Sequence, residues 1–152
     1  SRKFLESMDE KSVRPAAIYR YTGFASQQVS GLETIAARAQ QEIIEKVAAE
    51  GSCVIVGRRA DQILKGKKDL FRVFVTAPIP ARAKRVAQRE NLSEQESVQK
   101  IKKADKERSA YYNQHPGQEW GAASTYDLCV DTDKLGVRGA ADLIVAAVQK
   151  LK

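Results

Sequence analysis

The sequence predicts an α/β fold in which helices cover both faces of a parallel sheet, a three-layer α/β/α arrangement. Three short segments rich in β-branched or aromatic residues are typical of strands: Cys53–Val56, Leu70–Ala77 and Tyr126–Val130. Segments whose apolar residues recur at helical spacing separate them. Strands that alternate with helices favour parallel pairing with right-handed crossovers.

The composition is typical of a globular protein with anionic partners. With 152 residues, of which 43% are apolar, we expect residues 1–152 to form a single domain. No apolar run approaches the roughly 20 residues of a membrane helix, and no signal peptide opens the sequence. We therefore expect a cytoplasmic protein without a membrane partner. The net charge of +7 favours phosphorylated or polyanionic partners.

Both cysteines lie in strand-like runs, so the sequence predicts that Cys53 and Cys129 are buried free thiols. No group of residues has the spacing of metal ligands, and no metal-binding residue is expected.

The first strong helix signal begins at Ser30, which fits a capping box with Glu33, and ends at Gly51. Before it, Ala17–Tyr21 is a candidate for a further strand. A short second helix is predicted over Arg59–Leu64.

A basic helix follows the strand at Leu70–Ala77, and Pro80 suits its first turn. Its Arg82, Arg85 and Arg89 share one face because of their spacing. The stripe is either solvated basic surface or a clamp for an anion, and spacing alone leaves both interpretations open.

The next helix is unusually charged. Ser93 and Glu96 form a capping box at its start, and it is predicted over about residues 94–113. Its polar face carries Lys102, Asp105, Arg108 and Tyr112. A helix of this kind packs poorly in a core, so residues 93–117 are predicted to be a lid-like arm over an anion.

Three further features complete the pattern. His115 is expected to be a surface residue rather than a catalytic base. Trp120 is expected to anchor its loop by packing. A final helix is predicted from about Val137 to Lys150.

Two arginines, Arg58 and Arg59, stand directly beyond the predicted strand at Cys53–Val56. Ligands bind at the carboxyl ends of strands in open α/β sheets, and guanidinium groups suit the capture of phosphate or carboxylate. The alternative is that both are ordinary solvated residues of a turn.

Four segments together resemble the cytidylate kinase-like family, a group within the P-loop nucleoside monophosphate kinases. They are Val54–Asp61, Phe71–Pro78, Asp105–Tyr112 and Trp120–Thr132, and the resemblance covers about residues 31–150. It implies a P-loop kinase fold and ATP-dependent phosphoryl transfer to a nucleoside monophosphate, cytidylate-like, or to a related small acceptor. ATP and Mg²⁺ are the implied cofactors, and nucleotides are the implied partners.

The resemblance also implies roles for individual residues. Arg108 would act catalytically on the phosphates, with Asp105 orienting it. The residues that would bind the acceptor substrate are Arg58, Arg59, Asp61 and Tyr112. Arg85, Arg89 and Lys102 would lie on the ATP side. Asp61 or Asp131 could order Mg²⁺ through water.

The sequence departs from the family pattern in two places. Arg59 stands where cytidylate kinases carry an acidic residue that reads cytosine, which leaves the base preference open. No Gly-rich phosphate loop of the kind that cradles ATP occurs in these residues. Together with the small number of strands, this predicts that the first strand and the phosphate loop lie outside this sequence, so that the domain is N-terminally incomplete.

Two alternatives remain open at this point. The first is a non-catalytic module on a kinase scaffold that binds nucleotide or nucleic acid through its basic residues, although nucleic acid is the less expected partner. The second is a basic α/β domain whose charge only keeps it in solution. An unpaired sheet edge also makes a homodimer a candidate assembly.

Overall fold

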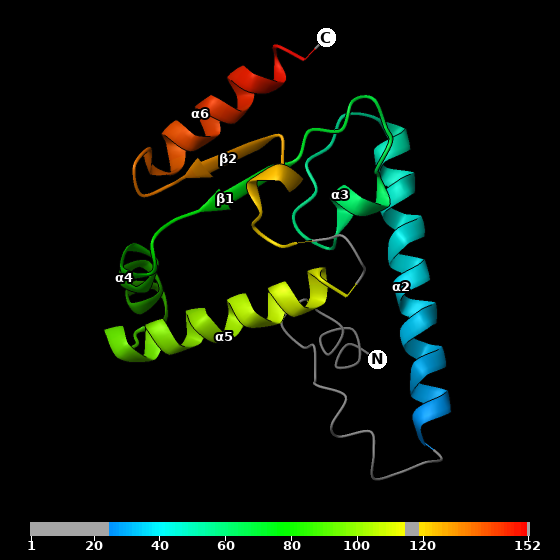
Figure 1. The fold of residues 1–152 in the computed structure, drawn as a ribbon, viewed down its shortest axis with the longest axis horizontal. Helices are drawn as coiled ribbons and strands as arrows, with labels where there is room; N and C mark the ends of the chain where they lie inside the picture. Colours follow the sequence, from blue (N-terminus) through cyan, green and yellow to red (C-terminus); the bar gives the residue numbers. More distant parts are fainter. Residues whose placement is uncertain (1–24, 115–118, 152) are drawn as a thin grey trace. The chain divides into compact units, whose positions relative to one another are not determined.

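The computed structural model describes residues 25–114 and 119–151 (Figure 1). These residues form five α-helices, one 3-10 turn and two strands, in the order α2, α3, β1, α4, α5, η2, β2, α6. The chain divides into two compact units, residues 1–70 and 71–152. Within the described ranges, no helix has the length and apolar character needed to cross a bilayer. The predictions for Ala17–Tyr21 and His115 lie outside the described residues.

The first unit is built on α2 (Ala25–Glu50) and the short α3 (Ala60–Ile63), which pack together. Its core consists of Ile44, Ala60 and Leu64. The short helix predicted after Arg59 is therefore confirmed. The capping box predicted at Ser30 is wrong, because α2 begins at Ala25 and Ser30 lies inside it. A serine or glycine inside a helix costs about 1 kcal/mol or less relative to alanine, which does not interrupt it.

The strand predicted at Cys53–Val56 is also wrong. In the part of the chain that the structure describes, these residues form neither helix nor strand and pair with no neighbour. Val54 and Val56 are 93% and 87% exposed, whereas Ile55 packs on the core of α2 and α3. A β-branched run predicts extended backbone, but a strand also needs a neighbouring ladder.

The prediction that Cys53 and Cys129 are buried is wrong for a related reason. Both are free and exposed thiols. Cys53 belongs to the unpaired segment, and Cys129 belongs to a sheet of two strands in the described residues, which leaves its side chain uncovered.

The second unit confirms the parallel α/β class. β1 (Val73–Thr76) and β2 (Leu128–Asp131) pair in parallel, from Val73 opposite Leu128 to Thr76 opposite Asp131. β1 lies within the strand predicted at Leu70–Ala77, and β2 overlaps the strand predicted at Tyr126–Val130. Each strand begins later in the chain than predicted. α6 (Gly136–Val148) packs on β2, and η2 (Ala123–Thr125) precedes that strand.

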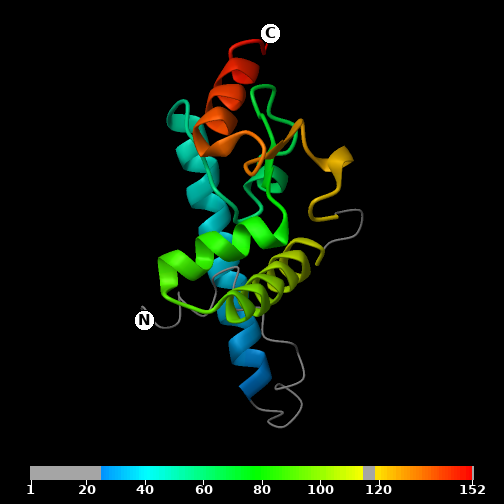
Figure 2. The ribbon, with the colours of Figure 1, turned by 90° about the vertical axis from the view of Figure 1, so that its left-hand side faces the viewer.

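Two helices, α4 (Ile79–Glu90) and α5 (Glu94–Tyr112), follow β1 and precede β2 in the chain. They pack on each other and cross at an angle (Figure 2). Asn91, in a left-handed conformation, ends α4. The predicted capping box begins α5: the Glu96 amide donates to Ser93 Oγ, and the Ser93 amide donates to Glu96 Oε2 at 2.9 Å. Local chemistry thus sets the turn between the two helices.

An aromatic cluster fixes the loop after α5 to the sheet. Phe74 of β1 contacts Trp120 edge to face, with ring centroids 5.4 Å apart, and contacts Tyr126 at 4.9 Å. The Trp120 amide donates to Asn113 Oδ1 at the end of α5, at 2.9 Å. The prediction that Trp120 is a packing anchor is confirmed.

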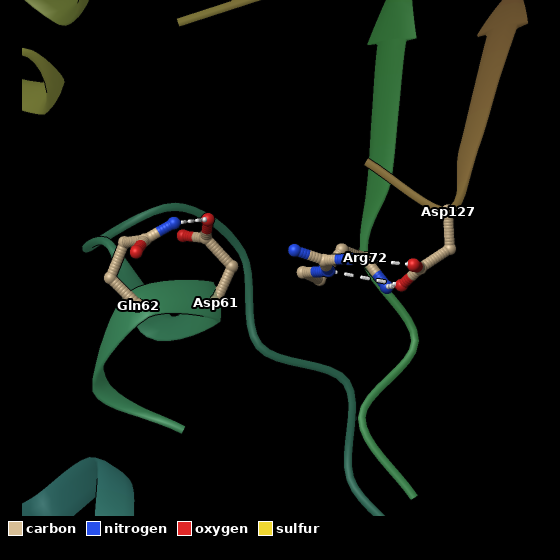
Figure 3. A network of polar contacts seen from close by, with 4 residues as sticks. All are labelled: Asp61, Gln62, Arg72 and Asp127. Atoms are coloured by element: carbon tan, nitrogen blue, oxygen red, sulfur yellow. Dashed lines mark hydrogen bonds and ion pairs between the residues drawn. The ribbon is translucent and has the colours of Figure 1, made fainter. Parts of the chain in front are cut away.

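The amino ends of the two strands are joined by an ion pair between Arg72 and Asp127 (Figure 3). Arg72 Nη2 donates to Asp127 Oδ1 at 2.7 Å, and both Nε and the backbone amide of Arg72 donate to Oδ2. These hydrogen bonds hold the pKa of Asp127 below its ordinary value. The carboxylate therefore stabilises the start of the sheet in its charged form.

Replacing Asp127 with asparagine should lower the free energy of unfolding at neutral pH by about 1 kcal/mol. Because the folded-state pKa lies below the unfolded value of about 3.9, this stabilisation is present above that pH. It disappears as the pH falls through the folded-state pKa. Urea denaturation at several pH values should show the gap between wild type and D127N closing in acid. D142N, which removes an exposed charge on α6, is the control, and a gap that persists in acid would contradict the assignment.

Replacing Gly121 with alanine should destabilise the protein by about 1–3 kcal/mol. Gly121 has a φ of 80°, and a Cβ there would lie 3.2 Å from Phe74 Cζ. G136A is the matched control, because Gly136 has a φ of 68° and open space around it. Denaturation followed by circular dichroism should show a larger loss for G121A than for G136A. Equal losses would mean that the close contact of the added Cβ with Phe74 does not destabilise the protein.

Candidate functional site

Three charged side chains meet where α4 packs on α5. Asp105 and Arg108 lie three residues apart on one face of α5, and Arg82 reaches them from α4. Arg82 donates to both carboxylate oxygens of Asp105, from Nη1 and Nη2, each at 2.6 Å. Arg108 Nη1 donates to Asp105 Oδ1 at 3.4 Å. The predicted contact of Asp105 with Arg108 is therefore present, but Arg82 is the stronger partner.

The cluster is partly buried and carries an excess positive charge. The side chains of Arg82, Asp105 and Arg108 are 25%, 23% and 36% exposed. The hydrogen bonds to Asp105 raise the pKa of Arg82, against the opposing effect of burial. Two guanidinium groups share one carboxylate, so an anion that approached the cluster would meet an uncompensated charge in surroundings less polar than water.

Arg108 is the member of the cluster with open hydrogen-bonding capacity. Over residues 25–114 and 119–151, Asp105 is its one hydrogen-bonding partner, through a single long contact. A guanidinium has five N–H donors, so most of those of Arg108 remain available for a ligand. Bidentate capture of a phosphate is the chemistry that such a group performs best.

Arg85 is held at the carboxyl ends of the two strands. Its Nη1 and Nη2 donate to Thr132 Oγ1 at 3.3 and 3.4 Å, and that hydroxyl donates to the carbonyl of Thr76 at 3.1 Å. Ligands bind at this edge in open α/β sheets. Neither Thr132 nor Thr76 was predicted from the sequence as a site residue. A threonine directly after a strand of a parallel pair is the signal that could have found them.

Arg89 has different surroundings from Arg85, although both were predicted on the ATP side. Arg89 Nη2 contacts Glu90 at 3.0 Å, and Lys100 of α5 binds the same carboxylate. These contacts, that of Lys100 foremost, hold the pKa of Glu90 below its ordinary value. Arg89 therefore belongs to an ion-pair cluster at the end of α4. Lys102 is exposed on α5.

In the first unit, Arg58 and Arg59 occupy a strained turn. Both are partly buried and, with Gly57, adopt positive φ angles of 61°, 54° and 68°. Such angles cost a non-glycine residue about 1 kcal/mol or more and cluster at functional sites. Gln40 of α2 supports the turn, since it accepts from Arg58 Nη1 at 3.3 Å and donates to the Arg58 carbonyl. Gln40 was not predicted from the sequence as a site residue.

The structure also gives the contacts or burial of the other predicted residues. Asp61 accepts a hydrogen bond from Gln62 Nε2 at 2.9 Å (Figure 3). Tyr112 is 6% exposed, which favours a packing role for its ring. Asp131 accepts from the Asp133 amide in its own turn. The predicted meeting of Arg58 and Arg108 at one ligand stays a prediction.

The donor set fits phosphate groups better than a bare metal ion. Where the chain is described, no group of three His, Cys, Asp or Glu side chains could hold a metal. The guanidinium groups of Arg85 and Arg108 have the charge and geometry for phosphate oxygens. A divalent ion here would be held chiefly by the phosphates of a nucleotide and by water.

A family profile and individual relatives of known name point to the same protein family. The sequence profile of the cytidylate kinase-like family matches residues 1–134. A cytidylate kinase from Pyrococcus horikoshii is 33% identical over 106 residues, which cover 70% of this chain and 54% of that protein. One from Methanocaldococcus jannaschii is 28% identical over 109 residues, which cover 70% and 61%. The chain thus spans between 54% and 61% of the length of these two relatives.

A solved structure supports the fold. The crystal structure of an uncharacterized protein from Eubacterium ventriosum has a TM-score of 0.67 and 32% sequence identity to this chain, and the match covers 74% of this chain and 64% of the other. Both curated relatives bear the name of a kinase, so they do not support the alternative of a non-catalytic module.

Replacing Thr132 with valine should lower the free energy of unfolding by about 1 kcal/mol. The change keeps the shape of the side chain but removes the hydroxyl that joins Arg85 to the Thr76 carbonyl. Thr132→Ser keeps that hydroxyl and should remain close to wild type. Urea denaturation compares the three proteins, and a valine variant as stable as the serine variant would contradict the role of the hydroxyl.

Proposed function

We propose, because this chain belongs to the cytidylate kinase-like family, that it takes part in ATP-dependent phosphoryl transfer to a nucleoside monophosphate. Membership rests on the family match over residues 1–134, and the parallel α/β fold agrees with it. The transferase activity, the substrates and the cofactors are the proposal.

The observation that carries this proposal is the state of Arg108. It is partly buried and is touched by a carboxylate that Arg82 already binds. Among the residues that the structure describes, Asp105 is its one hydrogen-bonding partner, which leaves most of its donors open. Phosphoryl transfer requires little covalent chemistry from a protein; it depends on positioning and on neutralising the charge of the phosphoryl oxygens. The charge of Arg108 and its partial burial support its assignment to that task.

The other residues support particular parts of the reaction. Arg85, at the carboxyl ends of β1 and β2, is proposed to bind the phosphates of the donor. Arg58 and Arg59 are proposed to hold the acceptor phosphate, since the strained turn presents two guanidinium groups. When bound, ATP supplies the phosphoryl group and Mg²⁺ offsets its charge. The arm formed by α5 is proposed to close over the phosphates of the donor.

The partners proposed are therefore nucleotides rather than nucleic acid, and the location proposed is the cytoplasm. The base of the acceptor is left to experiment, because Arg59 replaces the acidic residue expected of a cytosine-reading site. A homodimer stays a prediction; Val75 of β1 and Val145 of α6, both more than half exposed, are compatible with further packing.

Replacing Arg108 with alanine should lower kcat/KM for phosphoryl transfer by about 10²–10³-fold, which corresponds to about 2–4 kcal/mol of lost charge stabilisation. The free energy of unfolding should change little, because Asp105 keeps its bidentate bond to Arg82. The assay uses the full-length protein with ATP, Mg²⁺ and each of the common nucleoside monophosphates. Lys106→Ala, at an exposed position of α5, is the control for removal of a positive charge.

Two results would contradict the proposal. One is turnover by R108A equal to that of the wild type. The other is an absence of turnover by wild type with every monophosphate, together with nucleic-acid binding that weakens steeply as salt rises. The second result would favour the binding-module alternative.

A further inference from the structure

We propose that Arg82 is a positioning residue, which holds Asp105 so that Arg108 remains available to the transferred phosphoryl group. This inference rests on the proposed function, because it concerns how the same site is assembled. Neither the spacing of the arginine stripe nor the resemblance to the family assigns this role to Arg82.

The contacts of Asp105 are unequal. Each of its carboxylate oxygens accepts a hydrogen bond of 2.6 Å from Arg82, in the planar fork that guanidinium and carboxylate form best. Arg108 reaches Asp105 through one contact of 3.4 Å, beyond the usual range for a strong hydrogen bond. The orientation of the carboxylate is thus set from α4, and Arg108 only rests against it.

Arg82 is well placed to act as a fixed support. Its amide donates to the Pro78 carbonyl at 3.1 Å, in the first turn of α4, directly after β1. The next residue, Ala83, is fully buried. Because β1 is paired with β2, the backbone of Arg82 is tied to the sheet. The Arg82–Asp105 pair therefore connects the arm formed by α5 to the sheet of its own unit.

The charges explain why the pair matters to Arg108. If Arg82 were absent, Asp105 would be a partly buried carboxylate whose nearest cation is Arg108. A strong ion pair would then form between residues three apart on the same helix, and it would occupy the donors that a phosphate needs. With Arg82 present, Asp105 is already satisfied. Arg82 thus leaves the N–H donors of Arg108 available to a phosphate.

This arrangement predicts a rescue that direct binding of substrate by Arg82 does not. Arg82→Met should lower kcat by about 10–100-fold, since a small misplacement of a positioned group has effects of that order. Adding Asp105→Asn to that variant should restore kcat by about tenfold, because coupled residues deviate from additivity by this amount. The neutral amide no longer captures Arg108.

Two further variants separate this role from a general effect on stability. Arg82→Lys keeps the charge but loses the planar fork, and it should fall between wild type and R82M. It also replaces R82M if that variant does not fold. Glu90→Gln breaks the other ion pair between α4 and α5, the one with Lys100, and should leave kcat within about threefold of the wild type.

A second readout makes the inference independent of turnover. Inorganic phosphate is titrated into each full-length variant while the side-chain Nε–H resonance of Arg108 is followed by NMR. Phosphate should bind R82M about tenfold more weakly than wild type, and R82M/D105N should regain most of the loss. If the titration follows this order while wild type shows no phosphoryl transfer, the proposed function fails and the positioning role stands.

The role of Arg82 is overturned by either of two results. The first is an R82M variant, or R82K in its place, that matches wild type in both turnover and phosphate titration. The second is a loss in R82M that Asp105→Asn does not reverse, which would mean that Arg82 contacts the phosphate itself.

Discussion

The parallel register of β1 and β2 is the constraint on which the second unit depends. Since Thr76 lies opposite Asp131, both strands end at the same edge, and the segments that follow them start from one place. α4 leaves β1 there, and Thr132 follows β2 there. A shift of the register by one residue would separate Thr132 from the Thr76 carbonyl and remove the support of Arg85.

Beyond that edge, three arginines of α4 have three different partners. Arg82 binds Asp105 of α5, Arg85 binds Thr132 at the strand ends, and Arg89 binds Glu90 at the end of its own helix. The three side chains share one helix face, yet each meets a different partner. Residues of one charged stripe thus have different surroundings, and the acidic or hydroxyl group that faces each arginine sets the difference.

Much of this could be predicted from the sequence where local chemistry decides. The capping box at Ser93, the aromatic anchor at Trp120 and the two paired strands follow from residue types and their spacing. What could not be predicted depends on distant partners. Cys53–Val56 has the composition of a strand but no ladder in the described residues, and only the packing of α4 on α5 selects Arg82 as the partner of Asp105.

The aromatic cluster beside the arm has a practical consequence. Trp120 is the one tryptophan of the sequence, and its ring lies against Phe74 while its amide holds the last turn of α5. Indole emission changes in wavelength and intensity with the polarity around the ring. Intrinsic fluorescence can therefore test whether α5 moves, in the unlabelled protein and without a substitution.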